Sequence, residues 1–125
     1  IAFDPYRIKY LERELDQAGV EVELLPHGQG FYRSQQSNLW MPRSIEVTEK
    51  LIGEGKLTVA FNPCLRWNVA SAVMESDAKN NRSFTKRKAK GRIDGAVAMA
   101  MAVGLIMDEP EPEPSVYESR GVEFF

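Results

Sequence analysis

Apolar and polar positions in the first part of the chain change period in a way that predicts a strand, a helix and a second strand. Residues 1–3 form a short apolar run that Pro5 ends, and apolar residues then recur at helical spacing over residues 8–18. Gly19 supplies a C-terminal cap, and residues 20–25 alternate as a strand does. Two strands around one helix favour parallel pairing with a right-handed crossover, the core of an α/β sheet.

The middle of the chain predicts further elements of mixed type. Residues 26–42 are rich in Gly, Gln, Ser and aromatic side chains without sustained periodicity, which indicates an irregular loop able to contact a ligand. A helix is expected from Pro42 to Gly53 or Gly55, followed by a strand over residues 57–61. Residues 64–73 fit a short helix or extended structure. The flanks 73–76 and 82–85 predict a hairpin around the turn-forming residues 77–81.

The end of the chain divides into an apolar helix and an acidic tail. Residues 91–104 predict an alanine-rich helix with one acid, Asp94, in its first turn. Beyond Met107 the alternation of Glu and Pro cannot bury a core and predicts an extended, largely disordered segment. We therefore expect a folded domain over residues 1–107 and an acidic, proline-rich tail over residues 108–125.

Composition fits one soluble domain. The 125 residues are 43% hydrophobic and 27% charged, and the net charge of -2 does not decide for or against nucleic acid. The distribution of charge is more informative, because a basic cluster precedes the acidic tail: Lys86, Arg87, Lys88, Lys90 and Arg92. The lone Cys64 excludes an internal disulfide, and no apolar run approaches the roughly 20 residues of a membrane span. Because the chain opens in a strand at Ile1, we expect it to be part of a longer protein.

Two acids lie at the ends of predicted elements and suggest a site for a hard metal ion. Asp4 follows the first strand, and Asp94 opens the last helix. Each has a structural alternative, because an acid near a helix N-terminus commonly satisfies free backbone N–H groups and an Asp before Pro commonly starts a turn. From the residues alone, capping is favoured over metal binding for Asp94.

Several motifs together resemble the C-terminal nuclease part of the large terminase subunit of tailed bacteriophages. The resemblance covers residues 1–107 and rests on the order of Ile1-Ala2-Phe3-Asp4-Pro5-Tyr6-Arg7, His27-Gly28-Gln29-Gly30-Phe31, Asn62-Pro63 with Trp67-Asn68, and Lys86 and Lys88 before Arg92-Ile93-Asp94-Gly95. It implies a ribonuclease H-like fold, an α/β mixed sheet flanked by helices, here lacking its N-terminal strands. It also implies a metal-dependent endonuclease that cuts concatemeric double-stranded DNA into genome-length units.

The resemblance assigns Asp4 and Asp94 as catalytic acids that hold two Mg²⁺ or Mn²⁺ ions, and it reverses the preference for capping at Asp94. Two such ions activate a water and stabilise the leaving oxygen of a phosphodiester. The family's first catalytic acid and its Walker motifs belong upstream, and no Gly-x-x-x-x-Gly-Lys-Ser/Thr sequence occurs here. We therefore expect this stretch to hold only part of the nuclease site and to bind metal more weakly than the complete site does.

Lys86, Lys88 and Arg92 are candidates for binding DNA phosphates, and a solvated loop explains them about equally well. His27, the sole histidine, is assigned to loop packing rather than to acid–base chemistry. Trp40 and Trp67 are expected to pack in the core rather than stack on bases.

The resemblance further implies partners in a virus-infected bacterium. These are double-stranded DNA, the portal, the small terminase subunit and other copies in a motor, in the host cytoplasm and without a membrane. The competing hypothesis is a non-catalytic module that docks nucleic acid or protein and uses its acids only as caps. The acidic tail is a candidate tether for a packaging partner.

Overall fold

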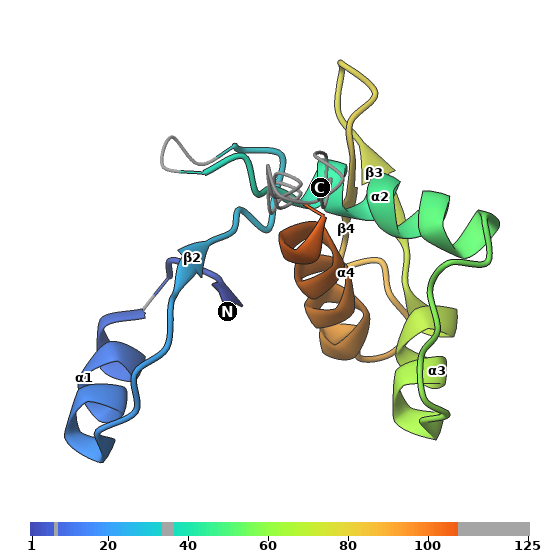
Figure 1. Ribbon diagram of the computed structural model, residues 1–125. Helices are drawn as coiled ribbons and strands as arrows, with labels where there is room; N and C mark the ends of the chain where they lie inside the picture. The colour runs from blue at the N-terminus through green and yellow to red at the C-terminus, as the bar shows by residue number, and fades with distance from the viewer. Residues whose placement is uncertain (7, 34–36, 108–125) are drawn as a thin grey trace, which may run out of the picture.

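The computed structural model describes residues 1–6, 8–33 and 37–107. Eight elements follow one another: β1 (Ala2–Phe3), α1 (Ile8–Ala18), β2 (Leu25–Pro26), α2 (Met41–Gly53), α3 (Pro63–Ser71), β3 (Met74–Ser76), β4 (Arg82–Phe84) and α4 (Asp94–Ile106). In Figure 1 the α1 and β2 segment forms an arm beside a body built from α2, α3, α4 and the β3–β4 hairpin. Within the described ranges, no helix has the length and apolar character needed to cross a membrane.

β1 and β2 confirm the predicted parallel pair around a helix. Ala2 pairs with Leu25 and Phe3 with Pro26. The ladder extends one step, because the backbone N–H of His27 donates to the Phe3 carbonyl at 2.8 Å. The prediction of a strand over 20–25 is wrong at its start, since residues 20–24 have no strand assignment. Apolar and polar residues alternate over 20–24 as in a strand, but β1 is too short to form hydrogen bonds with them.

The core lies between α2 and α4. Met41 and Ile45 of α2 pack against Val97, Ala100 and Met101 of α4, all of them buried. The helices approach so closely that a Cβ on Gly104 would lie 2.0 Å from Ser44 Oγ. α2 fits the predicted helix, with Pro42 in its first turn, where no backbone hydrogen bond is lost.

The next two predictions had different outcomes. The strand expected over residues 57–61 is wrong, because the structure gives these residues no strand and leaves Phe61 81% exposed. The ambiguous segment that follows is helical, as α3. Asn62 settles it, since its Oδ1 accepts a hydrogen bond from the Leu65 N–H at 3.0 Å and Pro63 fixes the first turn. Cys64, in that turn, is exposed.

The β3–β4 hairpin is confirmed, with Met74 opposite Phe84 in antiparallel register. Asp77 closes the turn by accepting from the N–H groups of Lys79 and Asn81. The Asn81 side chain donates to the same carboxylate, and this bond is the main reason that the pKa of Asp77 is lowered. The turn predicted over residues 77–81 is therefore confirmed.

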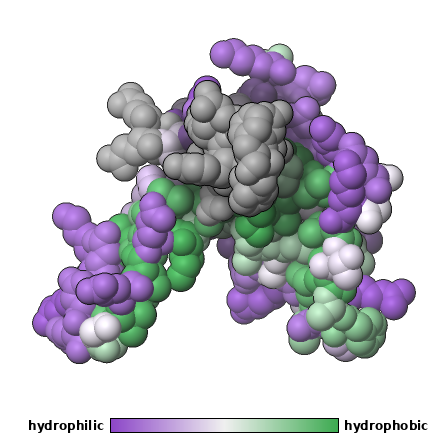
Figure 2. All heavy atoms as spheres, in the orientation of Figure 1, coloured by the Kyte–Doolittle hydropathy of each residue, from purple (hydrophilic) through white to green (hydrophobic). Residues whose placement is uncertain are grey.

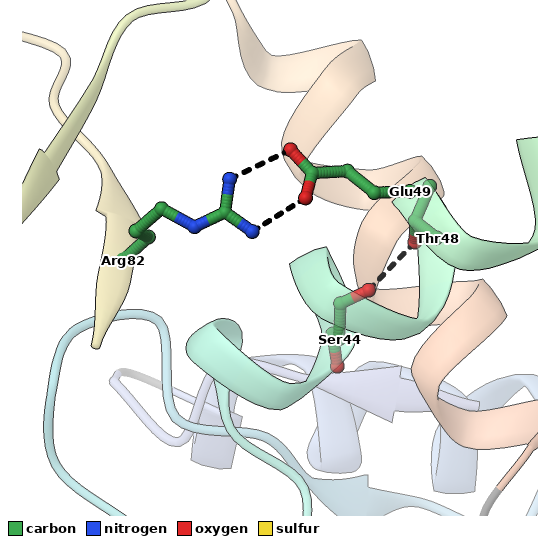
Figure 3. A network of polar contacts seen from close by, with 4 residues as sticks. All are labelled: Ser44, Thr48, Glu49 and Arg82. Carbon is green, nitrogen blue, oxygen red and sulfur yellow. Dashed lines mark hydrogen bonds and ion pairs between the residues drawn. The ribbon is translucent and has the colours of Figure 1, made fainter. Parts of the chain in front are cut away.

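An ion pair ties the hairpin to α2. Arg82 of β4 presents both terminal nitrogens to the two carboxylate oxygens of Glu49, one of them at 2.8 Å (Figure 3). On the same helix, Thr48 Oγ1 donates to the Ser44 carbonyl at 2.7 Å. The predicted tail over residues 108–125 lies outside the described residues.

Candidate functional site

The N-terminus of α4 is capped from another helix. Its N-cap residue, Ile93, carries no side-chain acceptor. Instead, Oδ1 of Asn68 on α3 accepts a hydrogen bond from the Gly95 N–H at 2.8 Å. Among the described residues, the Asp94 carboxylate accepts no backbone N–H, so the capping explanation for this acid is not supported. Asp94 opens the helix with its carboxylate available for other contacts.

Two glycines let α3 lie against the start of α4. A Cβ on Gly91 would lie 2.6 Å from an atom of the Trp67 ring, and one on Gly95 would lie 3.3 Å from Asn68 Oδ1. Asn68 is itself held in place, because its Nδ2 donates to the Cys64 carbonyl at 2.9 Å. Trp67 is 53% exposed, so its predicted place in the core is wrong. Its ring covers the loop before α4 instead.

Lys86 is the partner of Asp94. Its Nζ lies 2.8 Å from Oδ1, and both side chains are 63% exposed. The hydrogen bond and charge of Lys86 lower the pKa of Asp94, and the charge of Arg92 adds to this. The carboxylate is thus anionic at neutral pH, the state that binds a metal ion.

The three predicted phosphate-binding residues lie on one short connection between β4 and α4. Lys86 and Lys88 belong to the turn after β4, and the exposed Arg92 precedes Asp94 by two residues. Lys88 Nζ lies 3.4 Å from the Glu75 carboxylate on β3, away from the Lys86 pair. The connection therefore presents positive charge at solvent-exposed positions leading up to Asp94.

Asp4 follows β1 and is half-buried. Its Oδ1 accepts the N–H of Tyr6 at 3.1 Å, the turn contact that the sequence offered as the alternative to metal binding. β1, which precedes Asp4, contacts α4, the helix that Asp94 opens. No hydrogen bond joins the two acids, and the described ranges bring no group of three His, Cys, Asp or Glu residues together as metal ligands.

The chemistry of the two acids fits Mg²⁺ or Mn²⁺. Mg²⁺ is commonly bound through one or two carboxylates, with waters and substrate phosphates completing its octahedron. Asp94 offers an exposed anionic carboxylate that its own helix does not use. Asp4 would have to share or release its turn contact to act as a second ligand.

His27 has the packing role predicted for it. Its side chain is fully buried, and its Nε2 lies 2.8 Å from Ser44 Oγ of α2. Burial lowers the pKa of the imidazole, which favours the neutral ring. The ring joins the end of β2 to α2 and has no open face toward a substrate.

Comparison with known proteins shows the family to which this chain belongs. Residues 1–109 match the family described as "Terminase large subunit, endonuclease domain". The chain belongs to that family. It is 36% identical over 104 residues to the terminase large subunit of Enterobacteria phage HK97, which covers 83% of this chain and 19% of that protein. The terminase chain thus spans about a fifth of the length of this relative.

The fold of the terminase domain agrees with a solved relative. The crystal structure of the HK97 bacteriophage large terminase superposes with a TM-score of 0.72 at 36% sequence identity, covering 83% of this chain and 20% of that one. The predicted mixed α/β class is therefore confirmed.

The sequence patterns assigned Asn68 no role of its own beyond its place in the Trp67-Asn68 motif. Asn68 contacts Gly95, 27 residues later in the chain, so no local pattern shows the bond. The available signals were that motif and an apolar Ile93 at a position where a capping Ser, Thr, Asp or Asn is usual.

Proposed function

We propose that this terminase domain is a divalent-metal-dependent endonuclease that cuts concatemeric double-stranded DNA into genome-length units during packaging. The observation that supports the proposal most strongly is the state of Asp94. It is exposed and anionic, and it opens an otherwise apolar helix. It is not needed as a cap, because the Gly95 N–H donates to Asn68 Oδ1. Its contact with Lys86 is an exposed ion pair, which contributes little to stability, so the carboxylate can exchange that contact for a metal ion.

Asp94 and Asp4 are the proposed metal ligands, with Mg²⁺ or Mn²⁺ as the ions. When bound, the metals would activate a water and stabilise the leaving oxygen of the phosphodiester. Lys86 and Arg92 hold Asp94 ionised and present charge to the DNA backbone from beside it. Lys88, which pairs with Glu75, is proposed to contact a phosphate further along the strand.

Plasmid cleavage tests the proposal. Supercoiled DNA is incubated with the chain in Mn²⁺, Mg²⁺ or EDTA, beside Asp94→Ala, Asp4→Ala and the matched surface variant Asp16→Ala on α1. The proposal predicts nicking that requires metal and is lost in Asp94→Ala and Asp4→Ala. Nicking by Asp16→Ala should equal that of the parent chain. Metal-dependent nicking that survives Asp94→Ala contradicts the assignment. If the parent chain is inactive, the same variants are compared in a longer chain that includes the upstream part.

A docking module is the second candidate, favoured by an apolar groove between α2, α3 and α4. Ile52, Phe61, Val69 and Met99 line it, and the first three are each at least 46% exposed. This module would bind a packaging protein without cutting DNA. Phe61→Ser would then abolish partner binding, whereas Asp94→Ala would leave it intact.

The partners of the whole protein are proposed by analogy with the terminase large subunit. The proposed partners are double-stranded DNA, the portal, the small terminase subunit and further copies of the chain in a motor. The proposed location is the host cytoplasm.

A further inference from the structure

Asn68 performs the task that an acid in the first turn of a helix usually performs. The first backbone N–H groups of α4 have no acceptor within the helix, and a nearby carboxylate is attracted to them by hydrogen bonding and by the helix dipole. Asp94 lies beside those groups. Because Asn68 Oδ1 already accepts from Gly95 N–H at 2.8 Å, that donor is unavailable to Asp94.

We propose that Asn68 is a positioning residue of the nuclease site, which keeps the Asp94 carboxylate turned outward for a metal ion. The inference rests on the proposed function, since it concerns how the same acid is presented. Asn68 acts through the α4 backbone and does not itself touch the metal.

Three further contacts show that this arrangement is specific to the local structure. The amide of Asn68 is fixed at both ends, because Nδ2 donates to the Cys64 carbonyl while Oδ1 accepts from Gly95. Gly95 admits the amide, since a Cβ there would lie 3.3 Å from Oδ1. Lys86 then meets the carboxylate from the solvent side.

The test compares Mn²⁺ binding by the full chain and four variants: Asn68→Ala, Asn68→Asp, Asp94→Ala and Asn62→Ala. Binding is followed by calorimetry and by paramagnetic broadening of the NMR signals of the Asp94 and Gly95 amides. Asn62→Ala is the matched control, because it removes the same kind of cap from α3 itself. Hydrogen exchange at the Gly95 amide reports on the cap without metal.

Asn68→Ala is expected to weaken Mn²⁺ binding about tenfold, the usual effect of losing a residue that orients a ligand. It should also expose the Gly95 amide to exchange. Asn68→Asp should restore protection of that amide and Mn²⁺ binding, whereas Asn62→Ala should leave both as in the parent chain.

The two hypotheses fail in different ways. If Asp94→Ala loses Mn²⁺ binding and Asn68→Ala does not, Asn68 has no positioning role and the proposed function stands. If Asn62→Ala weakens Mn²⁺ binding as much as Asn68→Ala, the effect is general destabilisation and the inference is wrong. If the parent chain and Asp94→Ala give the same Mn²⁺ response, the metal site itself is refuted and the inference with it.

Discussion

His27 Nε2 and Ser44 Oγ lie 2.8 Å apart in a fully buried pair that connects the end of β2 to α2. The contact joins the N-terminal arm to the core helices through side chains 17 residues apart. Its stability depends on a neutral imidazole, since burial opposes the charged form.

Acid should therefore destabilise this domain through His27. The pKa of the ring is lowered in the folded chain, so below pH of about 6.5 the unfolded chain binds a proton that the folded chain does not. The free energy of unfolding should be fully retained above that pH and fall by up to about 1.4 kcal/mol per pH unit below it. Urea unfolding between pH 5 and 7.5 measures this slope. Since His27 is the sole histidine, His27→Gln should flatten the upper part of the curve; an unchanged slope would show that another group is responsible.

Gly104→Ala should destabilise the α2–α4 interface. The new Cβ would lie 2.0 Å from Ser44 Oγ and 2.8 Å from Ser44 Cβ, so the helices must separate or the serine must move. We expect a loss of about 1–3 kcal/mol in chemical denaturation, typical of overpacking.

Gly53→Ala at the end of α2 is the matched control for that substitution, because nothing lies within 4 Å of its added Cβ. It should be neutral or slightly stabilising, since alanine favours helix over glycine. Equal losses in both variants would show that the close approach at Ser44 is not the cause.

The Glu49–Arg82 pair should contribute modestly and lose strength in salt. Its side chains are 44% and 40% exposed, which limits such pairs to about 0.2–1 kcal/mol. A double-mutant cycle with Glu49→Gln and Arg82→Gln at low and high ionic strength measures the coupling. The Lys88–Glu75 pair, with a single contact at 3.4 Å, should give a smaller coupling. A coupling that does not change with salt would argue against an exposed ion pair.

The basic connection before α4 should govern the salt dependence of DNA binding. Lys86→Gln, Lys88→Gln and Arg92→Gln are each expected to weaken binding to duplex DNA and to lower the slope of log K against log salt by about 1. Fluorescence anisotropy at roughly 50 to 200 mM salt measures the binding constant and its salt slope. Lys56→Gln, an exposed lysine paired with Glu54 after α2, is the control and should leave the slope unchanged. A loss in this control equal to the others would indicate non-specific attraction.

Patterns that depend on near neighbours predicted three of the four described helices and the hairpin of this domain, and left α3 open between helix and extended structure. The 3.6-residue period placed α1 and α2, an apolar, alanine-rich run placed α4, and the Asp and Asn residues of the hairpin turn form the bonds expected of them. The strands failed at residues 20–24 and 57–61, where alternation was present but no neighbouring strand completes a ladder in the described part of the chain. Strand formation requires a partner that lies elsewhere in the sequence.

The candidate site followed the same division. Asp94 was visible because it is the one acid in the first turn of an apolar helix, and Lys86 followed from the charge cluster. The sequence did not predict that the two side chains contact each other, which they do at 2.8 Å. The contribution of Asn68 could not be predicted, because its partner Gly95 is reached only after α3 and α4 pack together.

The two small sheets differ in how far the chain must travel to close them. The β3–β4 hairpin joins segments five residues apart across the turn 77–81, whereas β1 meets β2 only after α1 and the segment that follows it. Closing the longer loop costs more chain entropy before any hydrogen bond compensates for it. In kinetic terms, the hairpin is expected to close early in folding and the parallel pair late, so the turn that holds Asp4 after β1 would be fixed later than the turn that holds Asp77.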